Sequence, residues 1–177
     1  IMEYNRKFVE NKGYEPYLTS KYPDKKLAIL TCMDTRLLEL LPAALGIKNG
    51  DAKIIKNAGG VIVHPYGSVV RSLLVGILEL GVEEVMVIGH TDCGVQGMDG
   101  HEMLEKLVER GIDQQHIDIV RHSGIDLERW LGGFESVESS VHETVRRLKE
   151  HPLMPKNVRI SGFIMDSATG ELTRVEE

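Results

Sequence analysis

Two short strings, Cys32-Met33-Asp34-Thr35-Arg36 and His90-Thr91-Asp92-Cys93, contain both cysteines of the chain and one histidine. Two thiolates and one imidazole form a ligand set that zinc prefers. Three protein ligands leave one position of a tetrahedral ion for water, which is typical of catalytic zinc, because structural zinc normally has four protein ligands. The residue types therefore predict a catalytic zinc site with Cys32, His90 and Cys93 as metal ligands.

The two cysteines have two other interpretations. They could be reduced thiols that pack as small apolar side chains, or they could form one disulfide. His90 stands three residues before Cys93, and this spacing favours metal binding over both alternatives. Nothing else in the sequence indicates an oxidising compartment, so we expect a reduced, cytoplasmic protein.

Charged side chains accompany the expected ligands. Asp34 lies two residues beyond Cys32, where it could accept a hydrogen bond from a zinc-bound hydroxide or ligate the zinc as a fourth protein ligand. Arg36 could hold Asp34 in a bidentate pair that favours the ionised carboxylate. Asp92 could accept a hydrogen bond near the site or be an exposed loop carboxylate.

Apolar runs and amphipathic segments alternate along the chain, which predicts an α/β fold with a mostly parallel central sheet flanked by helices. We expect one domain over residues 1–177, with residues 1–26 as an N-terminal helical arm. In such sheets, ligands bind beyond the carboxyl ends of the strands, where the strand order reverses. Cys32 follows the first expected strand and His90 the third, so the ligands would meet if these strands are neighbours. The expected strands lie at 27–30, 54–55, 85–88 and 158–164; the expected helices lie at 2–12, 37–45, 68–80 and 135–150, with a mainly helical segment at 102–129 and a solvated polar tail at 171–177.

The overall composition narrows the classes of partner. The chain is 42% hydrophobic and 27% charged, with a formal net charge of -6, which argues against nucleic acid or an anionic membrane as the main partner. No run of about 18 apolar residues is present, and the first residues show no secretory signal. The spacing of glycines around His90 does not match a nucleotide-binding motif.

Several strings together resemble the β-class carbonic anhydrases, and most closely their compact prokaryotic branch. Cys-x-Asp-x-Arg comes first, Asn57-Ala58-Gly59 second and Gly89-His90-x-x-Cys93-Gly94 third. The ending, from Val158 to Asp166 followed by Thr169-Gly170, is also similar to that family. The resemblance covers about residues 27 to 174, in the order the family has them.

The resemblance implies reversible, zinc-dependent hydration of carbon dioxide to bicarbonate and a proton. It implies one Zn²⁺ per chain on Cys32, His90 and Cys93, with a zinc-bound hydroxide oriented by an Asp34–Arg36 dyad. The dyad would be paired when water occupies the zinc and broken when Asp34 ligates it, so that activity would be lost at lower pH. A homodimer or higher homo-oligomer is implied, with the N-terminal helix reaching across to the partner. The implied substrate-binding residues, acting through backbone groups in the first three, are Asn57, Ala58, Gly59 and Gly94.

One difference from many family members is Val95, where a second glycine is common, and it could narrow access to the pocket. Carbon disulfide or carbonyl sulfide is therefore an alternative substrate on the same scaffold. A zinc-holding dimer without turnover is a third hypothesis, and an intact Asp34 and Arg36 argue against it.

His64, before Pro65, is expected in a surface turn. The remaining histidines outside the site are expected to be solvated: His101, His116, His122, His142 and His151.

Overall fold

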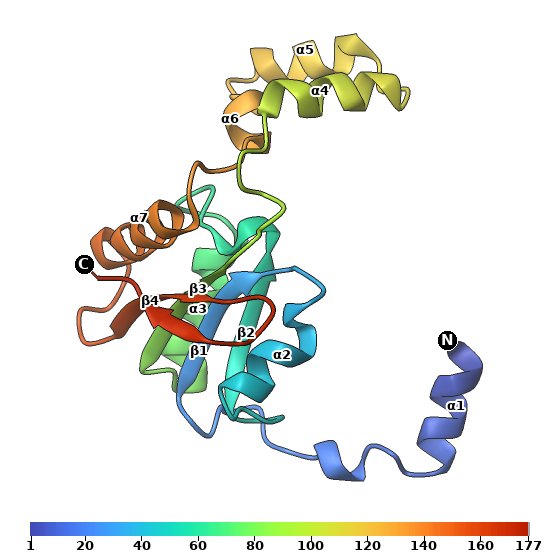
Figure 1. Ribbon diagram of the computed structural model, residues 1–177, viewed down its shortest axis with the longest axis vertical. Helices are drawn as coiled ribbons and strands as arrows, with labels where there is room; N and C mark the ends of the chain where they lie inside the picture. Colours follow the sequence, from blue (N-terminus) through green and yellow to red (C-terminus); the bar gives the residue numbers. More distant parts are fainter. Residues whose placement is uncertain (177) are drawn as a thin grey trace.

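The computed structural model describes residues 1–176; Glu177, the last residue of the expected domain, lies outside the described residues. A five-stranded sheet forms the centre of the molecule (Figure 1). Its strands, in the spatial order β2-β1-β3-β4-β5, are β1 (Leu27–Cys32), β2 (Ala52–Asn57), β3 (Glu84–His90), β4 (Arg159–Met165) and β5 (Leu172–Arg174). The helices are α1 (Met2–Glu10), α2 (Leu37–Ala44), α3 (Ser68–Leu80), α4 (Gly100–Glu109), α5 (Gln114–His122), α6 (Leu127–Leu131) and α7 (Val137–Glu150), with 3-10 turns η1 (Glu15–Tyr17) and η2 (Ala58–Gly60).

The first four strands are parallel, which confirms the expected mostly parallel sheet. β1 lies between β2 and β3, so the chain winds to one side after β1 and to the other side after β2. The strand order therefore reverses at β1 and β3. This places the carboxyl ends of the two strands that carry the expected ligands next to each other.

Every residue of β1 is buried, because helices cover both faces of the sheet. Ala28 and Leu30 belong to an apolar cluster with side chains of α3 and α7. Leu27 and Ile29 point to the other face and belong to a second cluster, with side chains of α2. This two-sided burial explains why β1 reads as a continuous apolar run rather than an alternating one.

Glycines end or interrupt the helices where the sequence predicts it. α3 has the predicted bounds and ends at Gly81, which has the left-handed φ of 75° that allows the chain to leave a helix. The expected helical segment 102–129 is divided into α4, α5 and α6 at Gly111 and Gly124, which have φ values of 92° and 90°.

Helices α4 to α6 form a lobe that extends from one end of the body, joined to it by the neck segments 96–99 and 132–136 (Figure 1). The lobe has its own small apolar cluster of Leu104, Ile117 and Leu127.

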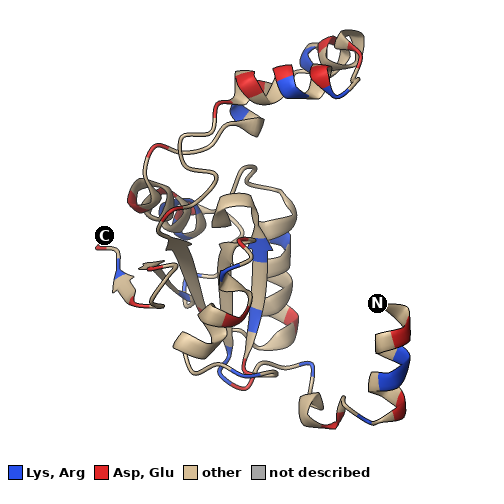
Figure 2. Cartoon of the chain, turned by 45° about the vertical axis from the view of Figure 1, so that its right-hand side comes forward, with Lys and Arg blue, Asp and Glu red and all other residues tan. Residues whose placement is uncertain are grey.

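The N-terminal arm also extends from the body, and α1 has no buried residue. Acidic and basic residues both occur along α1 and the lobe (Figure 2). Among the described residues, no helix is both long and apolar enough to cross a membrane.

Three expectations from the sequence are wrong in detail. The C-terminal tail is not simply solvated, because Leu172–Arg174 form β5, antiparallel to β4, and Val175 is buried. His151 is buried, and its Nε2 lies 2.9 Å from the carbonyl of Pro65, to which it donates a hydrogen bond. Cys32 and His90 are the last residues of their strands rather than the first residues beyond them. A three-residue edge strand and a long-range contact leave no periodic signal in the sequence.

Candidate metal centre

A buried group of three ligand-type side chains lies at the carboxyl end of the sheet. Cys32 ends β1 and His90 ends β3, and these strands pair in parallel. Cys93 follows in the turn after β3, and the ligand-type atoms of the three residues all lie within 4.8 Å of one another. The two Sγ atoms are 4.0 Å apart, close to the separation of about 3.8 Å that two Zn–S bonds of about 2.3 Å make at a tetrahedral ion. The cluster therefore has the dimensions of a metal site.

The orientation of the His90 ring also fits a metal ligand. Its Nδ1 lies 2.8 Å from the carbonyl oxygen of Thr91, which can only accept a hydrogen bond, so Nδ1 carries the proton. Nε2 is buried and, in the described part of the chain, has no hydrogen-bond partner. A buried polar atom without a partner is costly, and the free lone pair of Nε2 is the one that a metal would take.

The thiol environment is consistent with a cation between the sulfur atoms. Burial, together with the neighbouring Cys32, raises the pKa of the Cys93 thiol above its ordinary value. Two buried thiolates without a cation would repel each other, whereas a divalent cation would stabilise both. The donor set of two sulfurs and one imidazole nitrogen is one that zinc accepts.

Asp34 lies at the edge of the cluster, paired with Arg36. Nε and Nη2 of Arg36 donate to Oδ1 and Oδ2 of Asp34 at 3.0 and 2.9 Å, and the backbone N–H of Arg36 donates to Oδ1 at 2.9 Å. These hydrogen bonds lower the pKa of Asp34 to about 2. The carboxylate is thus ionised at neutral pH, and its Oδ2 lies 3.8 Å from Nε2 of His90.

Asp92 contacts Arg36. Its Oδ2 accepts from Nη1 of Arg36 at 2.8 Å, and its backbone carbonyl accepts from Nη2 at 2.8 Å. Asp92 has a left-handed φ of 53°, a conformation that aspartate tolerates better than most residues. The structure shows both roles that the sequence left open, because the Asp92 side chain accepts a hydrogen bond from Arg36 and is also 85% exposed in the turn after β3.

The loop after β2 supplies the glycines expected near the substrate. The side chain of Asn57 closes this loop by donating to the carbonyl of Val61 and accepting from its N–H, so only backbone groups of the loop are available. Gly60 has a φ of 66°, and a Cβ there would lie 2.9 Å from the backbone carbon of Thr31, so only glycine fits between the loop and β1. Ala58 is exposed, and Gly94 faces open space.

Apolar side chains stand over Gly59, where a Cβ would lie 3.0 Å from the ring of Phe134 and 3.3 Å from Val95. Phe134 was not predicted from the sequence, because it follows the lobe in the chain. It comes close to Val95 because Gln96 pairs with Phe134 at the neck. Both side chains contact the apolar cluster that includes Cys32 and Cys93. The Val95 side chain therefore contributes to an apolar wall beside the metal centre.

Lys56 is a second residue near the cluster that was not predicted from the sequence. It pairs with Thr31 across β1 and β2, and its Nζ lies 3.3 Å from the carbonyl of Leu37, to which it donates a hydrogen bond. Partial burial lowers its pKa, while the negative charges of Cys32 and Asp34 oppose this shift.

His64 is exposed, and its Nδ1 accepts from the N–H of Tyr66, which confirms the expected surface turn.

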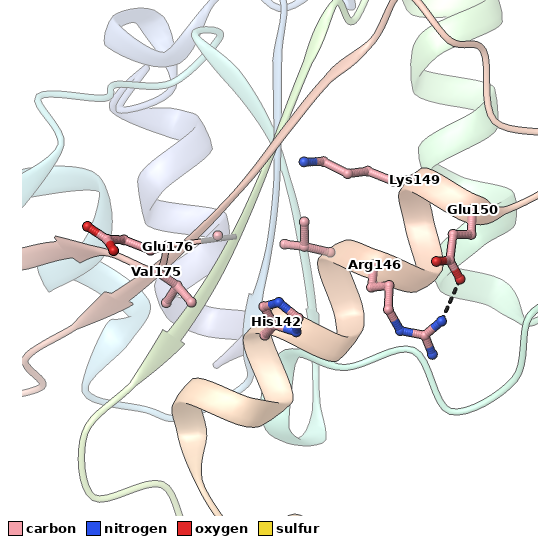
Figure 3. Close-up of a pocket in the computed structure, with 8 residues that line it drawn as sticks. His142, Arg146, Lys149, Glu150, Val175 and Glu176 are labelled. Atoms are coloured by element: carbon pink, nitrogen blue, oxygen red, sulfur yellow. Dashed lines mark hydrogen bonds and ion pairs between the residues drawn. The ribbon is translucent and has the colours of Figure 1, made fainter.

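Two surface cavities lie away from the Cys–His cluster. One of about 180 Å³ lies between α7 and the C-terminal residues, with His142, Arg146 and Glu176 in its wall (Figure 3). Another, of about 410 Å³, lies along α3 and includes Tyr66 and Leu74. Neither cavity contains a residue of the cluster, so the strongest candidate for chemistry is the cluster itself.

Comparison with known proteins identifies the family. The family model for carbonic anhydrase matches residues 27–172. The YvdA protein of Bacillus subtilis (strain 168), whose name marks it as a candidate carbonic anhydrase, is 53% identical over 172 residues, which cover 97% of this chain and 87% of the relative. A carbon disulfide hydrolase of Acidithiobacillus thiooxidans is 31% identical, over 84% of this chain and 76% of that protein. The crystal structure of β-carbonic anhydrase isoform I from Trichomonas vaginalis superimposes with a TM-score of 0.87 at 35% identity, over 98% of this chain and 94% of that one. The chain therefore belongs to the β-carbonic anhydrase family.

Proposed function

We propose that this protein catalyses the reversible hydration of carbon dioxide to bicarbonate and a proton, with one Zn²⁺ per chain held by Cys32, His90 and Cys93. The observation that carries the proposal is Nε2 of His90, which has no hydrogen-bond partner among residues 1–176 and lies in a buried cluster with two thiols beside an ionised carboxylate. When bound, zinc acts as a Lewis acid that lowers the pKa of water and so supplies a nucleophile near neutral pH.

Asp34 is the residue that orients this nucleophile. An ionised carboxylate only accepts hydrogen bonds, and Oδ2 lies at the edge of the cluster. It can therefore accept a hydrogen bond from the attacking group and so direct a lone pair of that group toward carbon. Arg36 fixes the carboxylate through two parallel hydrogen bonds and keeps it ionised.

Asp34 has a second possible position, on the metal itself. A carboxylate that becomes the fourth ligand would leave its bidentate pair with Arg36 and occupy the place of the reacting water. The resting enzyme would then be inactive, and we propose that this exchange accounts for any loss of activity at lower pH.

The substrate pocket is assigned to the loop of Asn57, Ala58 and Gly59, to Gly94 and to the apolar wall. Carbon dioxide is small and has no net dipole, so it needs apolar surface and few hydrogen bonds. Val95 and Phe134 provide such surface over Gly59, and the backbone groups of the loop can hold the oxygen atoms of bicarbonate.

We further propose that the protein acts as a homodimer or a larger homo-oligomer in the cytoplasm. α1 exposes Met2, Tyr4 and Val9 and buries no side chain within its own chain. An amphipathic helix of nine residues is marginal alone in water, so packing against a second copy would stabilise it. Two β-carbonic anhydrases of the same fold, from Sordaria macrospora, are described as tetrameric.

Carbon disulfide hydrolysis is the second candidate, because a carbon disulfide hydrolase is 31% identical to this chain. Both reactions need the same metal ligands, so access to the pocket would decide between them. Val95, Phe134 and Val61 are among the described side chains that limit the space over Gly59.

The test is stopped-flow hydration of carbon dioxide by zinc-loaded protein, from about pH 6.5 to about pH 9, around the expected pKa of activated water. Activity that rises toward alkaline pH would support the proposal. Carbon disulfide hydrolysis is measured on the same preparation. Turnover of carbon disulfide alone would favour the second candidate, and a fully zinc-loaded protein inactive on both substrates would contradict catalysis.

A further inference from the structure

Arg36 is held from two directions. One edge of its guanidinium, Nε and Nη2, faces Asp34, and the adjacent edge, Nη1 and Nη2, faces Asp92. The backbone carbonyl of Asp92 accepts a hydrogen bond from the second N–H of Nη2. Four of the five N–H groups of the guanidinium therefore have partners.

The element that presents Asp92 is itself fixed to the sheet. The N–H of Thr91 donates to the carbonyl of Met165 at 3.0 Å, and Thr91 Oγ1 accepts from the N–H of Ser167 at 3.0 Å. The turn that contains Asp92 is thus tied to the end of β4. The left-handed φ of 53° then directs the carbonyl and carboxylate of Asp92 to the same guanidinium.

We infer that Asp92 is a positioning residue, whose carboxylate and carbonyl fix the guanidinium of Arg36 so that its other edge is presented to Asp34. This inference deepens the proposed function and rests on it for its effect on catalysis. Arg36 alone is a long and flexible side chain, and ordering it costs conformational entropy. A second anchor lowers that cost for the Asp34–Arg36 pair, because the guanidinium is already oriented when Asp34 binds it.

The anchor also keeps Arg36 in place whenever Asp34 leaves it. An arginine with only one partner would turn to solvent when that partner moved, since its side chain is 41% exposed. With Asp92 as a second partner, the guanidinium stays where Asp34 can return to it. The contact between Arg36 and Asp92 thereby favours the paired arrangement of Asp34.

Two substitutions separate the carboxylate from the backbone geometry. Asp92→Gly removes the side chain and keeps the left-handed conformation, which glycine adopts without strain. Asp92→Asn keeps a side-chain oxygen that accepts a hydrogen bond, removes the charge, and also tolerates this conformation. Glu84→Gln is the matched control, because it removes the exposed ion pair with Arg159 at the opposite end of β3.

The primary readout is the Arg36 side-chain ¹⁵N–¹H NMR signal of the zinc-loaded protein, assigned by its absence in Arg36→Lys. A guanidinium bound on two edges should show slow rotation about its Cζ–Nη bonds and separate Nη signals. Asp92→Gly should merge the two proton signals of Nη1, whose partner is lost, whereas Asp92→Asn should keep them partly separate and Glu84→Gln should match the parent protein.

The second readout is kcat/KM for carbon dioxide hydration at equal zinc content. Because the carboxylate of Asp92 is exposed, we expect Asp92→Gly to lower kcat/KM by about two- to fivefold, with partial recovery in Asp92→Asn. Unchanged NMR signals in Asp92→Gly would overturn the anchor, and unchanged kcat/KM despite merged signals would overturn the positioning role. If the parent protein were inactive on carbon dioxide, the proposed function would fail, while the NMR comparison would still decide whether Asp92 holds Arg36.

Discussion

Oδ2 of Asp34 lies 3.8 Å from Nε2 of His90 and at the same time accepts a hydrogen bond from Arg36. The carboxylate therefore lies between the guanidinium of Arg36 and the Nε2 edge of the His90 ring, which is where a metal would bind. A displacement of the carboxylate toward His90 is the movement that the proposed exchange of Asp34 would require.

The first prediction concerns Asp34→Ala. The variant should keep its zinc, because the three proposed ligands remain, but lose about 10²-fold in hydration rate, because the acceptor proposed to orient the nucleophile is gone. Stopped-flow rates and zinc content measured on one preparation test this. Asp118→Ala, which removes a carboxylate of α5 in the lobe, should keep the parent rate. An Asp34→Ala protein with full activity would show that the carboxylate has no role in the reaction.

The second prediction concerns Cys93→Ser. Metal binding stabilises the folded state by mass action, by about 4 kcal/mol when free zinc is 1,000-fold above its Kd. The thermal midpoint of the parent protein should fall when zinc is chelated, whereas that of Cys93→Ser should hardly change. Zinc binding to the parent should also weaken as the pH falls, because the raised pKa of the Cys93 thiol makes its proton compete with the metal. A variant that binds zinc at one ion per chain would disprove the ligand assignment.

The third prediction compares two glycines that both have a positive φ. Gly60→Ala should destabilise the protein by about 3 kcal/mol or more, because strain adds to a collision with the backbone of Thr31. Gly81→Ala has the same kind of strain but no atom within 4 Å of the new Cβ, so it should cost about 1 kcal/mol. Urea unfolding of both variants measures the difference. Equal losses would mean that the close approach of the loop to β1 does not matter.

The fourth prediction concerns pH and Glu143, which accepts hydrogen bonds from Arg146 and Arg147 on α7. These bonds lower its pKa from 4.5 to about 2, so the stabilisation is present above about pH 4.5 and is lost as the pH falls toward 2. Its side chain is 40% exposed, so solvent screening reduces the gain to about 0.5–1 kcal/mol. Glu143→Gln should be less stable than the parent protein at pH 7 in urea unfolding. The difference should shrink as the pH approaches 2; a constant difference would assign the loss to packing.

Much of the fold could be predicted from local patterns. β1 reads as a buried strand because both of its faces are covered, and α3 ends at Gly81 because the chain needs a left-handed residue there. The three ligand-type residues could be brought together before the structure was known, because parallel strands place their carboxyl ends at one edge of a sheet.

Other features depend on contacts that no local pattern records. The burial of His151 depends on the carbonyl of Pro65, far away in the sequence. Phe134 reaches the site only because the two segments of the neck pair with each other. The contact of Asp92 with Arg36 could not be predicted, because it depends on a left-handed turn held by β4.

The hydrogen bonds of the neck also determine where the chain can gain or lose residues. Gly97 donates to the carbonyl of Phe134, and Gly133 donates to that of Met98, so the chain enters and leaves the lobe at one place. Added residues at Gly111 or Gly124 would therefore cost mainly loop entropy, which grows slowly with length, and would not shift the register of β3 or β4. New chain ends could be opened at these turns for the same reason. Insertions, deletions and circular permutation in the lobe should therefore leave the sheet and the candidate metal centre unchanged.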